Sequence, residues 1–536
     1  MTTIFAARKV ITMTAADASA FAAVGEWVVA VGSLDDLRSR FPGSEVIDFG
    51  DAVLTPGFYD SHIHLAVASE DLLNVDLSPG AVRSLSDARA VLTEAAETTP
   101  HGQWIRASRY DDGKVSGGAI TRFELDEISR EHPILVLHIA GHWGVANSRA
   151  LELGGITEVS EAPPGGELGR DASGRLNGVL YERALFEFAY PSVSSGEPIV
   201  PPNSFEDRLT GLQRAVQMFH AAGLTSINDA LVGPDDLVLF QEAERRGVLT
   251  LRVNMLLSVD HYDAMARLGL RSGFGGTRLR VNGVKGFVDG AIGGRTCLLE
   301  QPFEGRDDHG MQTTSTADLA EIVERVHCDG SRLGIHANGD RAIALLLDRY
   351  EAAAAAFPRD DVRHRIEHCS VVTEEIVGRM HRLGAIAVPF ANYVSFHGGN
   401  LVAWYGKERV ERMFAHRWFL DRGVAVAGSS DYPCGPFEPL YAMQGCVTRL
   451  GDDGAEVGLS QRIAPREALG LYTTGSAYAS HEEAIKGKIA PGHLADFVVL
   501  GEDPLTVPAE RIGSVPVLAT YVGARRVWGG ELALTH

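Results

Sequence analysis

Two histidines, His62 and His64, stand two residues apart at the end of a short apolar segment. In an extended strand, side chains at this spacing point to the same face, so both imidazoles could hold one ion. Imidazole and carboxylate groups are common ligands of zinc and similar metals. An H-x-H pair alone is more often a surface feature or part of a satisfied core. The pair therefore indicates a metal site only if the chain supplies further ligands.

Other residues of the same chemical kind follow predicted strands. His336 lies at the end of a short apolar run, His368 ends the strand candidate 365–368, and Asp431 follows the strand candidate 424–429. Each has a structural alternative, because a core histidine can bond to a carbonyl and an aspartate can cap a helix. All of them, however, fall at strand ends in one predicted barrel, where such ends converge on a single mouth. A shared metal site is therefore the favoured interpretation.

Lys285 lies within an apolar run, residues 281–289. A bare ammonium buried beside two cations would be strongly unfavourable. Desolvation would lower the pKa of the amine and make it nucleophilic, so that it could react with carbon dioxide. The product, an anionic carbamate, could bridge two metals. The alternative is an ion pair of Lys285 with Asp289 or Glu367.

The elements that must position these residues follow a pattern of helix, glycine and apolar strand. Ser315 and Thr316 can begin a helix that ends at Gly330, and an apolar strand follows. Repetition of this pattern predicts a parallel sheet. The strand candidates are 53–64, 224–229, 249–257, 281–289, 333–337, 365–368, 385–390 and 424–429. Their number is that of a (β/α)8 TIM barrel, an α/β fold.

The rest of the chain divides into two further units. Short runs rich in β-branched and aromatic residues at both ends predict a small β-sandwich built from residues 1–55 and 485–536. The barrel then comprises residues 56–69 and 203–484. Residues 70–202 are too long for a normal crossover and are predicted to form an inserted domain or lid. Within them, 133–140 is another strand candidate and 162–178 is predicted to form hairpins or a mobile lid.

Composition excludes several classes of function. The formal net charge of −21 argues against nucleic-acid binding, which requires a basic face. The apolar stretch 21–32 is interrupted by Glu26 and is too short to cross a membrane, and the first residues lack the order of a signal peptide. The five cysteines show no C-x-x-C spacing, which favours a reducing compartment. A soluble, cytoplasmic protein with a small-molecule substrate is expected.

Several segments together resemble the amidohydrolase superfamily, specifically the YtcJ-like group of the amidohydrolase 3 family, and the likeness covers nearly the whole chain. The matching segments are 55–64, 284–290 with 294–296, 336–340, 365–368, 428–431 and 487–497. The resemblance implies a binuclear centre, usually of zinc, with a carboxylated lysine at Lys285. The implied metal ligands are His62, His64, Lys285, His336, His368 and Asp431.

Outside the ligand set, the sequence gives less specific expectations. Substrate contacts are expected from His142, Trp143 and Arg295, although segment 139–143 lacks the acidic residue that the family places before its Gly-His pair. Asp60 and Asp340 could orient ligands, with a turn or a cap as the alternative for each. The aromatic residues that could line an apolar pocket, or simply form core, are Trp143, Phe390, Phe396 and Trp404.

The chemistry expected of such a centre is hydrolysis. Two metals would lower the pKa of a shared water and give hydroxide, which would attack a polarised carbonyl. Asp431 would take the proton and pass it to the leaving nitrogen. The predicted substrate has an amide-type C–N bond, such as an N-formyl or N-acyl amine, because group members resemble N-substituted formamide deformylases. Cyclic amides and esters remain open, and a homodimer is a family-level expectation.

Two other functions compete with this prediction. A deaminase of the same superfamily would use one metal, and Lys285 argues against it because that chemistry needs no bridging carbamate. A non-catalytic binding or regulatory protein could retain the fold. It would have little need of all the proposed ligands together, which disfavours that interpretation.

Overall fold

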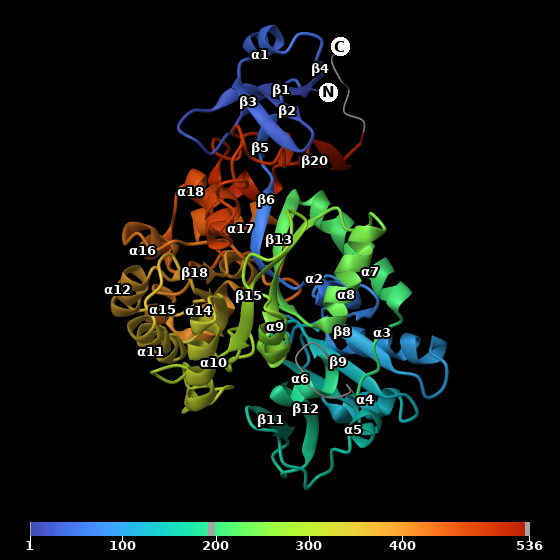
Figure 1. The fold of residues 1–536 in the computed structure, drawn as a ribbon. Helices are drawn as coiled ribbons and strands as arrows, with labels where there is room; N and C mark the ends of the chain where they lie inside the picture. The colour runs from blue at the N-terminus through green and yellow to red at the C-terminus, as the bar shows by residue number, and fades with distance from the viewer. Residues whose placement is uncertain (1, 191–198, 531–536) are drawn as a thin grey trace.

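The computed structural model describes residues 2–190 and 199–530, and these residues form three sheets (Figure 1). The central sheet has seven parallel strands in the order β18-β17-β16-β15-β14-β13-β6. Its strands are β6 (Phe58–Ile63), β13 (Leu224–Val232), β14 (Arg252–Ser258), β15 (Leu279–Phe287), β16 (Leu333–Ala337), β17 (Arg365–His368) and β18 (Ile386–Pro389). Every residue of β14 is buried, as expected for a parallel sheet that is covered on both faces.

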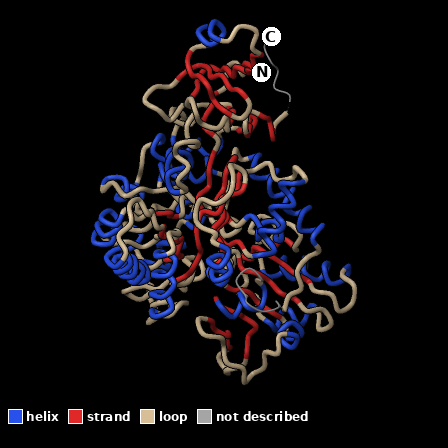
Figure 2. Tube along the Cα trace, viewed as in Figure 1, coloured by secondary structure: helices blue, strands red, loops and turns tan. Residues whose placement is uncertain are grey.

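Helices alternate with these strands and surround them (Figure 2). The longer ones are α7 (Phe205–Ala221), α8 (Pro234–Arg245), α10 (Thr316–Cys328), α11 (Asp340–Ala356), α12 (Glu374–Leu383) and α17 (Pro439–Thr448). The shorter ones are α9 (Tyr262–Leu268), α13 (Tyr393–His397), α14 (Gly399–Tyr405), α15 (Lys407–Val410), α16 (His416–Asp421), α18 (Pro465–Gly470) and α19 (Ser476–Ala479). The predicted start of α10 is confirmed, because the Ser315 side chain accepts a hydrogen bond from the Asp318 amide.

The sheet closes through an irregular segment. No regular strand forms at 424–429, where the sequence predicted one. Instead, Val426 and Ser429 make isolated parallel bridges to Ala387 and Phe390. On the other side, the Ser61 amide donates to the Gly428 carbonyl at 3.0 Å. Within this segment the Tyr472 ring packs on Gly428, where a Cβ atom would lie 2.7 Å from Tyr472 Cε2.

The predicted strand at 53–64 is two strands that belong to different sheets. They separate at Gly57, where a Cβ atom would lie 2.1 Å from Thr225 Oγ1, so no larger residue fits. The preceding strand, β5 (Val53–Pro56), pairs with β19 (Phe497–Leu500), and β6 pairs with β13. The first predicted barrel strand is therefore only half as long as expected.

The terminal sheet contains eight strands from both ends of the chain. Besides β5 and β19 it has β1 (Thr2–Val10), β2 (Ala18–Val24), β3 (Trp27–Gly32), β4 (Glu45–Asp48), β20 (Val517–Val522) and β21 (Arg525–Trp528). Helix α1 (Leu34–Arg40) follows β3. The core of this sheet includes the rings of Phe5, Phe21 and Phe497. The two ends of the chain thus meet in one sheet, as the sequence indicated.

The long segment between β6 and β13 has a six-stranded sheet of its own, in the order β11-β12-β10-β9-β8-β7. Its strands are β7 (Val75–Asp76), β8 (Ile105–Tyr110), β9 (Ile134–His138), β10 (Trp143–Ala146), β11 (Gly166–Arg170) and β12 (Leu176–Glu182). The helices of this region are α2 (Leu65–Asp71), α3 (Leu85–Thr98), α4 (Arg122–Ile128), α5 (Ser148–Leu153) and α6 (Arg183–Ala189). The hairpin predicted within 162–178 is the antiparallel pair β11–β12. The domain boundaries themselves stay a prediction.

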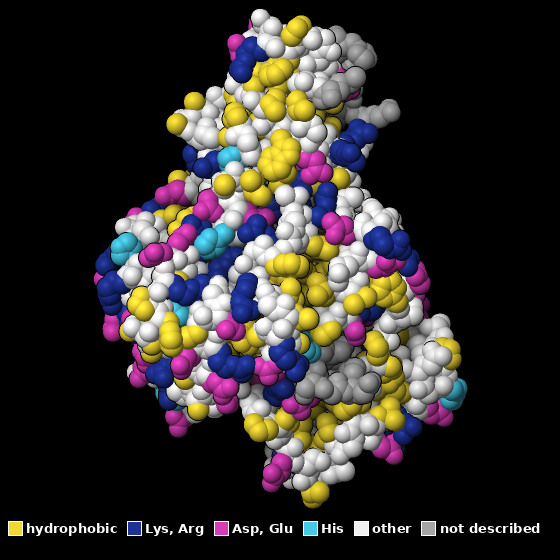
Figure 3. All heavy atoms as spheres, viewed as in Figure 1, with side chains coloured by type: hydrophobic (Ala, Val, Ile, Leu, Met, Phe, Trp, Pro, Cys, Tyr) yellow, Lys and Arg dark blue, Asp and Glu magenta, His cyan; other side chains and the backbone are white. Residues whose placement is uncertain are grey.

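Basic and acidic side chains are interspersed on the face drawn in Figure 3, and no basic stripe crosses it. Within the described residues, no helix is long and apolar enough to span a membrane.

Candidate metal centre

The six predicted ligands meet at the carboxyl end of the central sheet. His62 lies in β6 and His64 directly follows it. Lys285, His336 and His368 lie in β15, β16 and β17. Asp431 lies just after the irregular closing segment. Strand ends converge at this edge of a barrel-like sheet, which explains how residues far apart in sequence come together.

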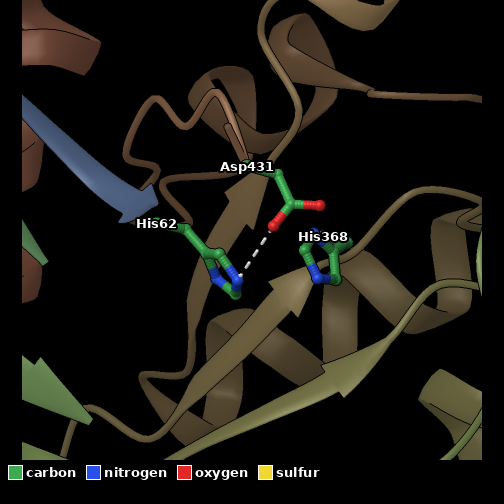
Figure 4. Close-up of side chains that lie close together, drawn as sticks. All are labelled: His62, His368 and Asp431. Atoms are coloured by element: carbon green, nitrogen blue, oxygen red, sulfur yellow. Dashed lines mark ion pairs between the residues drawn. The ribbon is translucent and has the colours of Figure 1, made fainter. Parts of the chain in front are cut away.

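The Asp431 carboxylate lies close to the imidazoles of His62 and His64. Its Oδ1 lies 3.3 Å from His62 Nε2 and 3.0 Å from His64 Nε2. The His368 ring lies beside them, with its centroid 4.5 Å from that of His62. Ligand atoms of His62, His368 and Asp431 all lie within 4.8 Å of one another, and the three side chains point toward a common space (Figure 4). This cluster has the donor types and the spacing that a divalent cation requires.

His336 and Lys285 complete the group. The rings of His336 and His368 are 4.5 Å apart, and Lys285 Nζ is 3.5 Å from His62 Nε2. His336 Nε2 lies 3.0 Å from the Gly290 carbonyl, to which it can donate, so Nδ1 is left as the ligand atom. Burial lowers the pKa values of His62, His336 and His368 well below the usual range. These histidines are therefore neutral at neutral pH, which is the form that binds metal.

Glu367 orients His62 from behind. Its Oε2 bonds His62 Nδ1, so His62 Nε2 faces the other ligands. Arg365 holds this carboxylate through Nε at 2.6 Å and Nη2 at 2.9 Å. The same guanidinium donates to the Ser61 carbonyl, next to His62 in β6. A carboxylate that bonds the far nitrogen of a histidine ligand is common at metal sites, and in the sequence only the Arg-x-Glu-His motif at residues 365–368 indicated it.

Neither proposed acidic partner of Lys285 is free to pair with it. Glu367 is engaged by Arg365 and His62. Asp289 accepts backbone hydrogen bonds from Leu298, Asn338 and Gly339, each at 2.9 Å. The Lys285 side chain is 1% exposed, and no ion pair found among the described residues includes it. Desolvation lowers its pKa from 10.5 to about 8. An amine in this setting has the reactivity that carbamate formation requires.

Two ligands have strained backbones. His368 has a φ of 70° and Asp431 a φ of 56°, in the left-handed region that non-glycine residues rarely adopt. Each such residue costs on the order of 1–3 kcal/mol. The surrounding fold thus holds both side chains in place against a local preference, as is frequent at functional sites.

Asp60 connects two ligand-bearing segments. Its Oδ1 accepts from the His62 amide at 3.0 Å, and its Oδ2 accepts from the Ser430 amide at 3.1 Å. Burial raises the pKa of this carboxyl to about 7. Asp340, in contrast, accepts from the Glu300 amide and pairs with Arg412 at 3.1 Å. Its position is therefore that of a structural residue at the start of α11.

A cavity of about 60 Å³ opens beside the ligands, and His142 of the inserted segment lines it. His142 Nδ1 bonds Glu182 at 2.6 Å, and its ring centroid lies 4.9 Å from that of His336. The other two predicted substrate residues do not line this cavity. Trp143 stacks on His138 with centroids 4.1 Å apart, and Arg295 pairs with Asp112 at 3.1 Å.

The predicted aromatic residues also have defined surroundings. Phe390 is 2% exposed and stacks on the His368 ring with centroids 4.5 Å apart. It therefore packs against this proposed metal ligand from within the hydrophobic core. Phe396 lies under Lys114, and Trp404 lies near the Arg295 guanidinium. None of these three lines the cavity beside the ligands.

Known proteins are similar to this chain over most of its length. The model of the amidohydrolase family (Amidohydro_3) matches residues 45–528. The chain is 30% identical to N-substituted formamide deformylase of Arthrobacter pascens, over 93% of this chain and 92% of the relative. It is 28% identical to the putative amidohydrolase YtcJ of Bacillus subtilis (strain 168), over 93% of each chain. The crystal structure of an uncharacterized metal-dependent hydrolase from Pyrococcus horikoshii OT3 superposes with a TM-score of 0.75 and 24% identity, covering 95% of this chain and 99% of that one.

Proposed function

Since this chain belongs to the amidohydrolase family, we propose that it is a hydrolase that binds two divalent metal ions, with zinc preferred, and cleaves an amide-type C–N bond outside peptides. The proposed ligands are His62, His64, Lys285, His336, His368 and Asp431. An N-formyl or N-acyl amine is the proposed substrate class, since a relative with 30% identity is an N-substituted formamide deformylase.

The observation that carries the proposal is the isolation of Lys285. A buried amine that forms no ion pair is costly, and Lys285 Nζ lies beside the His62 imidazole, while Glu367 and Asp431 act on it only as nearby charges. As a carbamate, the side chain would instead supply an anionic ligand for the cations. The resident imidazoles and Asp431 would complete the coordination of those cations.

Bound ions would supply Lewis acidity, which lowers the pKa of a water and polarises a carbonyl. The other tasks belong to the chain itself. Asp431 lies within reach of His62 and His64 and can hold the proton that the attacking water loses, then deliver it to the departing nitrogen. His142 faces the cavity with Nδ1 anchored by Glu182, so its other ring nitrogen can contact the substrate carbonyl or acyl group.

Metal content and hydrolysis measured on the same samples test the proposal. Protein loaded with zinc should hold about two ions per chain and should hydrolyse members of a panel of N-formyl and N-acyl amines. Lys285→Ala should lose at least one ion and at least about 100-fold in rate, equivalent to about 2.7 kcal/mol of the barrier. Lys407→Ala, at an exposed lysine in α15, serves as the matched control and should change neither quantity.

The alternatives give different outcomes. A single ion that persists in Lys285→Ala, together with release of ammonia from an aminated ring, would favour a deaminase. Absence of stoichiometric metal and of hydrolysis would favour a binding or regulatory protein. Two ions with no turnover of the amide panel would keep the centre and exclude the proposed substrate class.

A further inference from the structure

A second, larger cavity lies next to the metal centre. The inner cavity beside the ligands measures about 60 Å³ and the second, hereafter the outer chamber, about 310 Å³. The two share lining residues from α2, β9 and the end of α6: Val67, Asp71, Leu137 and Tyr190. The outer chamber thus lies next to the inner cavity, on the other side of these shared side chains.

The inner cavity is too small for most amides. A single water needs about 10–15 Å³ on the same volume scale, so 60 Å³ holds roughly four to six waters. The attacking water and the reacting amide group already take up this space. Any substituent larger than a methyl or ethyl group must therefore extend past the shared wall, where the outer chamber has about five times the volume.

The wall of the outer chamber offers mainly apolar surface to a ligand. Of its charged residues, Arg208 contacts Glu70 at 2.7 Å and Asp236 at 2.6 Å, whereas Asp71 and Asp235 form no ion pair among the described residues. Arg106 donates to the Pro201 carbonyl at 3.2 Å. The apolar lining comprises Ala66, Val67, Leu135, Leu137, Ala189 and Val200. A neutral, aliphatic group would bury these side chains without breaking an ion pair.

We propose that the outer chamber binds the larger substituent of the substrate, an extended and uncharged apolar group attached to the amide that reacts at the metal centre. This inference rests on the proposed function, because it assumes that the scissile amide lies among the six ligands. It defines the substrate class more narrowly as amides that carry an aliphatic chain long enough to cross the shared wall.

Binding of alkylhydroxamates tests the inference without relying on turnover. Hydroxamates chelate zinc through their head group, so acetohydroxamate probes the metal centre alone and octanohydroxamate also probes the chamber. Zinc-loaded protein is titrated with each compound by calorimetry. Each buried methylene contributes about fourfold in affinity. We expect octanohydroxamate to bind at least about 100-fold more tightly than acetohydroxamate.

Two variants test whether the preference for octanohydroxamate arises in the outer chamber. Ala189→Trp fills part of the outer chamber. Val67→Phe enlarges a side chain in the wall that the two cavities share and so reduces the space between them. Both should reduce the preference for octanohydroxamate to less than about tenfold, and Ala189→Trp, whose residue lines only the outer chamber, should change acetohydroxamate binding by less than about twofold. Val238→Trp is the matched control, because this side chain is 55% exposed on α8 and lines neither cavity.

The outcomes separate this inference from the proposed function. Tight acetohydroxamate binding without a chain-length preference, or a preference that both variants retain, would overturn the assignment of the chamber alone. Failure of zinc-loaded protein to bind either hydroxamate would overturn the metal centre and the chamber together.

Discussion

Replacing Lys285 with methionine should make the metal-free protein more stable while abolishing the binuclear centre. Burial lowers the pKa of the Lys285 amine from 10.5 to about 8 because the charged form is desolvated. Below pH 8 the folded chain must therefore bury an ammonium that forms no ion pair, and the charges of Glu367 and Asp431 offset only part of the desolvation cost. Methionine has a similar length and no charge, so it removes this cost.

The size of the expected gain in unfolding free energy follows from the linkage between proton binding and folding. A folded-state pKa lower than the unfolded value means that the unfolded chain binds more protons between pH 8 and 10.5, so the lysine's contribution to stability rises with pH through that window. Below pH 8 the full cost applies. The shift of about 2.5 units corresponds to about 3 kcal/mol at pH 7. Lys285→Met should recover most of it at pH 7 and progressively less as the pH rises above 8.

The assay is urea denaturation of chelator-treated protein in buffer free of carbon dioxide, with metal content measured in parallel samples. The matched comparison is Lys486→Met. Lys486 is also buried, but it pairs with Glu482 at 2.9 Å, and its loss should cost about 3–5 kcal/mol because the buried carboxylate loses its counter-ion and keeps only hydrogen bonds from Tyr59 and Asn254. If Lys285→Met destabilises the metal-free protein as Lys486→Met does, or still binds two ions, the reasoning about the isolated amine is refuted.

Two further predictions follow from the surrounding residues. Glu367→Gln, which weakens the bond to His62 Nδ1, should reduce zinc affinity by about 10–100-fold in a competition titration with a chromogenic chelator, and unchanged affinity would exclude an orienting role. Lowering the pH from 7 to 5 should remove about 2 kcal/mol of unfolding free energy through His220, because burial lowers its pKa from 6.5 to about 4 and the unfolded chain binds the extra proton. His220→Gln should lose correspondingly less over this range, and an equal loss in both proteins would contradict the assignment.

Much of the central sheet could be predicted from the sequence because its signals are local. Strands 333–337 and 365–368 were predicted at the positions of β16 and β17. The first is an apolar run that follows a helix, and burial on both faces favours a strand there. The second contains the charged residues Arg365 and Glu367 and was predicted as a strand without an apolar run. The ligands at these strand ends were predictable for the same reason.

The break between β5 and β6 at Gly57 and the bond from Glu367 to His62 both depend on residues that are distant in the sequence. Gly57 separates β5 from β6 because Thr225 packs against it, and Thr225 lies far along the chain. Glu367 could be expected near Lys285, but its bond to His62 depends on how β17 lies relative to β6. The interpretation of Trp143 and Arg295 as substrate residues drew on their motifs, whereas the structure engages them with His138 and Asp112. A motif places a residue near a site without fixing which way its side chain points.

The closure of the central sheet and the assembly of the metal centre depend on the same hydrogen bonds. The segment that bridges β18 and β6 is also the one that leads to Asp431, and the Asp431 amide donates to the His62 carbonyl at 2.8 Å. Asp60 binds the amides on both sides of this junction. A regular eighth strand would keep its residues in extended geometry, whereas Asp431 has a φ of 56° and lies 3.0 Å from His64 through its carboxylate. The irregularity that made this segment a poor strand therefore also sets the position of the proposed proton carrier.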